Sequence, residues 1–160
     1  MPGKTSAGLL MYRDRGNGIE VLLVHPGGPF FRNKDDGAWS IPKGEVNPGE
    51  DFLERAKLEF QEELGFIPLG ELLALGSVKQ KGGKTVHAWA LPGDLAENFA
   101  VDSNMFEIEW PPRSGKRQSF PEIDRASFFP VDIARRKINP AQIALLDRLM
   151  ELLKDRSVDC

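Results

Sequence analysis

The sequence predicts an α/β fold, with a mixed β-sheet and helices on both of its faces. The order of the segments is the first observation: strands come first, then a helix, then more strands and finally a second helix. The second observation is that runs such as LLM and VLLV are apolar without interruption, as in strands that are covered on both faces. Because the chain has no repeat, low-complexity run or linker, we expect one domain over residues 1–160.

The first two strands are predicted at Ser6–Arg13 and Ile19–His25, which pair across a polar turn. The glycine, proline and aspartate content of Pro26–Gly37 then predicts a loop. Phe30 and Phe31 lie inside that loop, where large apolar side chains are unusual. They either pack against the side of the domain, which we favour, or form an aromatic lip for a base.

A short strand predicted at Ala38–Pro42 leads into the first helix. Glu50 or Asp51 caps the start of this helix, because carboxylates are favourable at a helix N-terminus, and Gly65 ends it. Its apolar side has the spacing of a core-facing surface and consists of Leu53, Ala56, Phe60 and Leu64.

The second half of the chain continues the sheet. Strands are predicted at Glu71–Lys79 and Thr85–Leu91, around a glycine-containing turn. Alternating apolar residues predict a half-buried strand at Met105–Trp110, and Phe128–Phe129 ends a further core strand. We expect the aromatic residues of these segments and of the first short strand to be structural rather than catalytic: His87, Trp39, Trp89 and Trp110.

The last helix opens at Asn139 and Pro140, an N-cap residue followed by proline at the first helical position. Its apolar side consists of Ile143, Leu146, Leu149, Leu152 and Leu153.

Three carboxylates share one side of the first helix. At roughly 100° per residue, Glu59, Glu62 and Glu63 fall within an arc of about 100°, beside the apolar stripe. They repel one another unless a positive group lies between them. A hard divalent cation such as Mg²⁺ takes oxygen ligands of this kind together with substrate phosphates. The alternative is a solvated acidic face, which most charge runs are.

The segment from Gly44 to Phe66 resembles the Nudix box. That pattern is a glycine, five residues, a glutamate, seven residues and then Arg-Glu-apolar-any-Glu-Glu-any-Gly-apolar. It is matched here at Gly44, Glu50, Glu59, Phe60, Glu62, Glu63, Gly65 and Phe66, with Leu58 in place of the arginine. Segments outside the box extend the resemblance to a bacterial subgroup of predicted NTP pyrophosphohydrolases. These segments are SAGLLMYR, WSIPKGE, QKGGKTVHAW and WPPRSGKRQSFPEIDRA.

The resemblance implies an α/β/α sandwich in which the box forms a loop-helix-loop metal site. It also implies hydrolysis of a pyrophosphate bond in a nucleoside diphosphate-linked substrate, with Mg²⁺ or Mn²⁺ as cofactor. Glu59, Glu62 and Glu63 match the metal-binding and catalytic glutamates, and Glu59 also matches the position often assigned to the general base. The Gly44 carbonyl matches a further metal ligand, and Glu50 more often stabilises the loop.

Many members of the family take one more carboxylate from outside the box. The candidates in this sequence are Glu107, Glu109, Glu122 and Asp124. We favour Glu122 as the additional metal ligand, because it lies in a predicted loop shortly before the last strand, where such a residue often lies.

Basic residues indicate how the substrate is bound. The Pro-Lys-Gly start of the box, with Lys43, resembles members that act on dinucleoside polyphosphates, diphosphoinositol polyphosphates and some nucleoside triphosphates. Lys43 either neutralises an additional phosphate or is a solvated surface lysine. Arg113, Lys116 and Arg117 either bind the same polyphosphate or form a charged hairpin tip.

Leu58 leaves a question about the site, because it cannot form the hydrogen bonds of the arginine it replaces. Its position is predicted to lie away from the apolar stripe of the helix. Arg55, one turn before Glu59, is a candidate substitute. The leading hypothesis is therefore a metal-dependent hydrolase of a dinucleoside polyphosphate or nucleoside triphosphate. The alternative is a Nudix-fold nucleotide-binding or regulatory module with weak turnover.

Composition limits the other possibilities. A net charge of −3 over 160 residues argues against binding a nucleic-acid polymer, so we expect a small phosphorylated substrate. No apolar run approaches a membrane span, and the start of the chain does not resemble a signal peptide. The single cysteine, Cys160, excludes an internal disulfide and favours a reducing compartment. We expect a cytoplasmic protein that is a monomer or homodimer and does not bind membranes.

Overall fold

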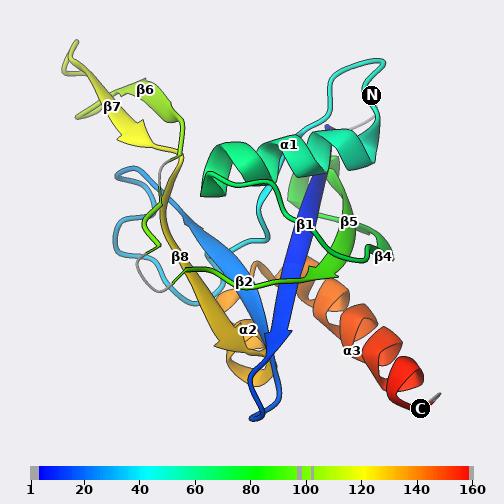
Figure 1. The fold of residues 1–160 in the computed structure, drawn as a ribbon. Helices are drawn as coiled ribbons and strands as arrows, with labels where there is room; N and C mark the ends of the chain where they lie inside the picture. The colour runs from blue at the N-terminus through cyan, green and yellow to red at the C-terminus, as the bar shows by residue number, and fades with distance from the viewer. Residues whose placement is uncertain (1–3, 97–98, 102, 159–160) are drawn as a thin grey trace.

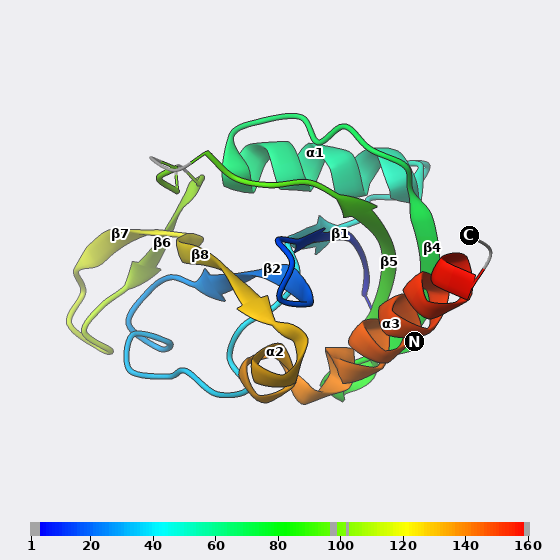
Figure 2. The same ribbon diagram turned by 60° about the horizontal axis from the view of Figure 1, so that its bottom comes forward.

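A computed structural model describes residues 4–96, 99–101 and 103–158. Cys160 lies outside the described residues. One mixed sheet separates a single helix on one face from two helices on the other (Figures 1 and 2). The α/β fold with helices on both sides of a mixed sheet is thus confirmed. No helix in the described part of the chain is long and apolar enough to cross a bilayer.

The main sheet has the strand order β4-β5-β1-β2-β8, with β3 paired to β1. Only β1 and β5 run parallel, whereas the other pairs are antiparallel. The strands of the sheet are β1 (Thr5–Asp14), β2 (Ile19–Pro26), β3 (Lys43–Glu45), β4 (Leu73–Lys79), β5 (Thr85–Pro92) and β8 (Ile123–Pro130).

β1 and β2 separate at one end, and the start of the box enters the gap. The last residues of β1 pair with β2, whereas its first residues pair with β3. The strand predicted at Ala38–Pro42 is wrong in detail, because only isolated bridges form there and the regular strand begins at Lys43. Pro42 has no backbone N–H to donate to a ladder, although its carbonyl accepts a bond of 3.1 Å from the N–H of Leu9.

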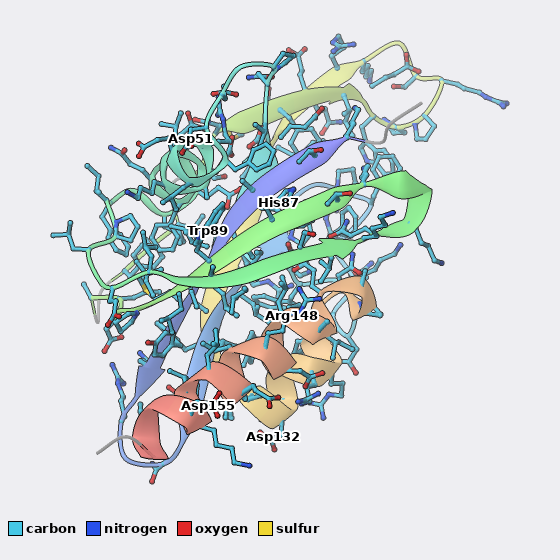
Figure 3. The ribbon with its side chains drawn as sticks, turned by 90° about the vertical axis from the view of Figure 1, so that its right-hand side faces the viewer. Asp51, His87, Trp89, Asp132, Arg148 and Asp155 are labelled. Carbon is cyan, nitrogen blue, oxygen red and sulfur yellow. The ribbon has the colours of Figure 1, made fainter. Side chains whose placement is uncertain are left out.

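Alternating side chains of the strands build two cores. Ala7, Leu9 and Met11 of β1 face the helix α1 (Phe52–Leu64), whereas Leu10 faces the opposite core. The second core is covered by α2 (Val131–Lys137) and α3 (Ile143–Val158), as Figure 2 shows. Figure 3 places Asp51 on the α1 side, and Asp132, Arg148 and Asp155 on the helices of the other side.

The helix α2 was not predicted. Its seven residues are too few to show a helical period, and only one of them, Ala134, is buried. The predicted start of the last helix is confirmed. The Asn139 carboxamide accepts a bond of 3.0 Å from the Ala141 N–H and caps a short 3₁₀ turn, Pro140–Gln142, which leads directly into α3.

A separate hairpin projects from the sheet (Figure 1). It consists of β6 (Met105–Glu109) and β7 (Arg117–Pro121). Trp110, at its turn, contacts Phe30 edge to face with 5.4 Å between ring centroids. Trp110 thus has a packing contact, as a structural residue should, but it packs on a loop and belongs to neither core.

The end of β1 carries an ion-pair cluster that predicts a pH-dependent stability. Burial opposes the shift, but hydrogen bonds from Arg15 and Arg13 lower the pKa of Asp94 from 3.8 to about 2. A carboxylate with a lowered pKa stabilises the fold above its unfolded pKa, and this contribution is lost as the pH falls toward the folded pKa.

We expect Asp94→Asn to lower the free energy of unfolding at pH 7 by no more than about 1 kcal/mol, because the pair is partly exposed. The difference from the wild type should shrink between about pH 4 and pH 2, over the range set by the two pKa values of Asp94. Urea unfolding of both proteins across this range measures it. A difference that is constant with pH would show that the carboxylate charge has no such role.

Candidate active site

The helix α1 is positioned by caps at both ends. The Asp51 carboxylate accepts a bond of 3.0 Å from the Glu54 N–H, so Asp51 rather than Glu50 is the N-cap. Gly65 takes a left-handed conformation with φ 84°, and its N–H donates to the Gln61 carbonyl at 2.7 Å. Of the predicted apolar stripe, Ala56, Phe60 and Leu64 are buried against the sheet and Leu53 is partly buried. The packed stripe sets the direction in which the glutamates of α1 point.

Gly44 allows the box loop to lie directly against the helix. Its backbone pairs with Ala7 of β1. A Cβ atom on Gly44 would lie 1.9 Å from Cδ of Glu59, which no side chain permits. The residue at this position must therefore be glycine if the Glu59 carboxylate is to lie against the loop backbone.

Arg55 links two glutamates of the box. Its Nη1 donates to Oε1 of Glu59 at 3.0 Å, and its Nη2 donates to Oε2 of Glu50 at 2.6 Å. Oε1 of Glu50 also accepts a bond of 2.7 Å from the Asn47 N–H. Burial raises the pKa of Glu59 and repulsion from Glu62 adds to the rise, whereas the bond from Arg55 opposes it. Arg55, the candidate substitute for the missing arginine, thus pairs with Glu59 in the structure.

Glu63 is a buried carboxylate with an unused oxygen. Its exposed fraction is 7 %, and its Oε2 has no hydrogen-bond partner. Burial raises the pKa of Glu63 well above its usual range, and repulsion from Glu59 adds to the rise, while Lys43 opposes it. A buried charge without partners is strongly unfavourable, so this oxygen is suited to receive a cation.

Glu122 joins Glu63 from a distant part of the chain. Its backbone is held by two bonds, from the Gly27 N–H to its carbonyl at 2.9 Å and from its own N–H to the Asn104 carbonyl at 2.8 Å. Burial raises the pKa of Glu122, with a further rise from Glu62. The two glutamates line a cavity of about 160 Å³ whose walls are Val24, Pro26, Ser40, Ile41, Lys43, Glu63, Glu122 and Ile123.

The other three candidate carboxylates lie elsewhere. Glu107 forms an ion pair with Arg117 on the projecting hairpin, at 3.1 Å, and Glu109 lies on the same hairpin. Asp124 bonds the imidazole of His25. The structure therefore brings only Glu122 of the four candidates to the cavity beside Glu63.

Lys43 lies where two cavities adjoin. Burial lowers the pKa of its ammonium group and nearby Lys84 adds to the decrease, whereas Glu63 opposes it. Lys43 is therefore not the fully solvated surface lysine of the alternative interpretation. The second cavity has about 190 Å³ and is lined by Pro26, Phe31, Gly37, Ala38, Trp39, Ser40, Lys43, Gln80, Asn139 and Gln142.

The three other basic candidates are not gathered at this site. Arg113, Lys116 and Arg117 are exposed at the turn and start of β7 in the projecting hairpin (Figure 1), and none of them lines either cavity. This placement agrees with the charged hairpin tip that was the alternative prediction.

The aromatic residues near the site have different surroundings. Phe30 is 60 % exposed, whereas Phe31 is half-buried and lines the second cavity. Trp39 is buried and structural, as predicted, and its indole N–H donates to Asp35 at 2.8 Å. His87 stacks on Phe52 at 4.5 Å, and Figure 3 shows it on β5 beside α1. The predicted structural role of His87 agrees with this contact.

Two buried polar residues near the site were not predicted from the sequence. His25 is fully buried, with Nδ1 2.8 Å from Asp124 and Nε2 2.7 Å from the Lys34 carbonyl. Gln142 is also fully buried, and its side-chain carbonyl accepts a bond of 3.0 Å from the Ile41 N–H. A histidine at the end of an apolar strand and a glutamine near a helix start gave no signal, because their partners are remote in sequence.

The donor set fits a divalent cation, although the carboxylates are not gathered in advance. Within the described residues, no three acidic, histidine or cysteine side chains are close enough to form a ready metal site. Repulsion among like charges is expected to keep such groups apart without a cation. The unpartnered Oε2 of Glu63 and the close approach of Glu59 to the Gly44 backbone are the two features that match the oxygen ligands preferred by Mg²⁺.

A three-layer fold with a glutamate-bearing loop-helix-loop at the sheet defines the class of this protein, and comparison with known proteins confirms it. The family model of the NUDIX domain matches residues 2–149. The chain belongs to the NUDIX domain family.

A relative from mouse is similar to part of this chain. The chain is 30% identical over 98 residues to the 8-oxo-dGDP phosphatase NUDT18 of Mus musculus, a match that covers 59% of this chain and 28% of the mouse protein. The chain thus spans less than a third of the length of that relative.

Solved structures with low sequence identity share the fold. A C. elegans Ap4A hydrolase in a binary complex has a TM-score of 0.67 at 22% identity, covering 94% of this chain and 98% of that one. A mutT/nudix family protein from Listeria innocua also has a TM-score of 0.67, at 14% identity, covering 100% and 99%. The NUDIX domain of Shewanella oneidensis NrtR, complexed with ADP ribose, has a TM-score of 0.65 at 14% identity. That match covers 96% of this chain and 90% of the other one.

Proposed function

We propose that this protein is a metal-dependent hydrolase that cleaves a pyrophosphate bond in a nucleoside diphosphate-linked substrate. The observation that carries the proposal is the buried Oε2 of Glu63, which lacks a hydrogen-bond partner, on a residue that lines one cavity with Glu122 and Lys43. An enzyme that holds a cation against phosphates needs such oxygens, whereas a protein that only binds a nucleotide has little need for them.

Each glutamate has a role in the proposal. Glu59, Glu62, Glu63 and Glu122, with the Gly44 carbonyl, hold the cation, which is Mg²⁺ or Mn²⁺. When bound, the cation neutralises phosphate charge and makes water more acidic. Oε1 of Glu59 is occupied by Arg55, so Oε2 is the oxygen available to take a proton from the attacking water.

The substrate class follows from what lies around Lys43. Its ammonium group carries positive charge close to the glutamates, where it can bind a phosphate beyond the one that is attacked. The adjoining cavity of about 190 Å³ offers the Phe31 ring and the Gln80 carboxamide, which suit a nucleobase. These features favour a dinucleoside polyphosphate or a nucleoside triphosphate.

Lys43→Ala should raise KM more for substrates with longer phosphate chains, because the ammonium charge acts on the additional phosphates. We expect about a 10-fold rise for a dinucleoside tetraphosphate, equivalent to about 1.4 kcal/mol, and less than half of that effect for a nucleotide sugar. Steady-state kinetics with both substrates measure the two KM values, and Lys57→Ala is the control, because Lys57 lies on α1 and lines neither of these two cavities. An equal change for both substrates would reject the role.

The proposed function is tested by incubating the protein with Mg²⁺ or Mn²⁺ and a panel of phosphorylated compounds, then identifying the products. Release of a nucleotide and a phosphorylated fragment from a dinucleoside polyphosphate or triphosphate is the expected result. Tight nucleotide binding without products would instead favour the regulatory module. The monomeric or dimeric state, the single domain over residues 1–160 and the cytoplasmic location stay predictions.

A further inference from the structure

We propose that Arg55 is the positioning residue of the metal site and supplies, from one helical turn earlier, the guanidinium that the box pattern places at position 58. The inference rests on the proposed function, because its purpose is to hold Glu59. If it is correct, the chain has not lost the arginine that the box pattern has in place of Leu58, because Arg55 carries the same guanidinium group from another position.

The bonds of Arg55 join the two halves of the box. Its side chain is largely buried, with an exposed fraction of 14 %, and bonds Glu50 through Nε and Nη2 and Glu59 through Nη1. Glu50 in turn accepts the Asn47 N–H, so the loop before the helix is tied to the guanidinium. One side chain thus connects the loop that begins at Gly44 with the glutamate that lies against it.

Residue 58 lies on the same hollow of the surface as Arg55. Leu58 is 40 % exposed, and it lines a hollow of about 580 Å³ together with Arg55 and Glu50. Residues three positions apart are neighbours on a helix surface. A guanidinium carried by residue 58 would therefore enter the hollow that Arg55 lines, and it could reach Glu50 from there.

The physical effect of Arg55 is to keep Glu59 oriented. Without the guanidinium, Glu50 and Glu59 would be two carboxylates with no positive group between them, and Glu59 would be free to turn away from the Gly44 backbone. Partners that orient metal ligands typically change metal affinity or activity by about 10- to 100-fold when they are removed. Arg55 is thus expected to act on metal binding rather than on substrate.

The test exchanges the arginine between the two positions. The variants are Arg55→Ala, Leu58→Arg, their combination and Arg55→Lys, with Lys57→Ala as a control on the same helix. Mn²⁺ affinity without substrate, followed by electron paramagnetic resonance, is the first readout. The metal concentration required for half-maximal turnover is the second, and thermal unfolding in excess chelator reports whether each variant is folded.

Arg55→Ala should weaken Mn²⁺ binding by about 10-fold or more, with little change in KM at saturating metal. Adding Leu58→Arg to it should restore most of the loss, whereas Leu58→Arg alone should change binding less than about twofold. Arg55→Lys should recover little, because a single ammonium group does not bridge two carboxylates as a fork does. Lys57→Ala should bind like the wild type.

Two results would overturn the inference. One is wild-type Mn²⁺ affinity in folded Arg55→Ala, and the other is a folded double variant that binds as weakly as Arg55→Ala alone. If Arg55→Ala does not fold, the Mn²⁺ affinity of the folded Arg55→Lys variant is compared with that of the wild type instead, and equal affinities would overturn the inference. A wild-type protein that binds Mn²⁺ but hydrolyses nothing would reject the proposed function, while the Mn²⁺ affinities would still test Arg55.

Discussion

Hydrolysis is expected to stop when divalent cations are removed. Excess chelator should lower turnover by at least about 1,000-fold, or about 4 kcal/mol, because the cation provides most of the charge stabilisation in the transition state. The structural reason is the proposed ligand set. Glu59, Glu63 and Glu122 are carboxylates whose pKa values are raised by burial and by repulsion from neighbouring glutamates, and without a cation they cannot draw phosphate groups to themselves.

The measurement is turnover after dialysis against chelator, followed by titration with Mg²⁺, Mn²⁺ or Ca²⁺. Activity should return with Mg²⁺ or Mn²⁺ and scarcely with Ca²⁺, which has longer and less regular coordination. The unfolding temperature in chelator is the control that the protein remains folded. Turnover that persists in excess chelator would contradict the assignment of these glutamates as metal ligands.

Glu63→Gln is expected to reduce kcat by at least about 100-fold, or about 2.7 kcal/mol, at metal concentrations near those that the wild type needs. The change is nearly isosteric but removes the charge of the most buried carboxylate in the proposed site. An amide oxygen binds Mg²⁺ much more weakly than a carboxylate does. Kinetics over a metal titration therefore separate loss of metal affinity from loss of the chemical step.

Stability should move in the opposite direction to activity for this variant. Burial of an ionised carboxylate without a partner for Oε2 is unfavourable, so Glu63→Gln should leave the metal-free protein at least as stable as the wild type. Glu54→Gln is the matched control, because Glu54 lies on the same helix with a largely exposed side chain. Wild-type turnover of Glu63→Gln at limiting metal would show that this residue does not bind the cation.

Local patterns accounted for the elements that hold the box. The caps at Asp51 and Gly65 and the apolar stripe of α1 follow from residues within a few turns of one another, and the structure confirms them. The strands that lie within single apolar runs were predicted for the same reason. The strand predicted at Ala38–Pro42 was placed wrongly, because pairing in that segment depends on how β1 and β2 separate.

Residues that are distant along the chain meet only through the tertiary structure. Glu122 was one of four candidate carboxylates in the sequence, and its approach to Glu63 depends on β8 pairing beside β2. The burial of Lys43 between two cavities depends on the Pro26–Gly37 loop and on Asn139 and Gln142, which come just before α3. No periodicity encodes such contacts, because they arise from the order of strands in the sheet.

The sequence by itself determined the family and three of the glutamates, because these are encoded in short-range spacing along a helix and its loop. It also determined the α/β layers, through the order of strands and helices and the uninterrupted apolar runs. The tertiary structure alone decided that Glu63 is buried with an unpartnered oxygen and that Arg113 and Lys116 lie away from the cavities. The physical reason is that burial and pairing depend on what packs against a side chain, and that partner is most often supplied by another element of the fold.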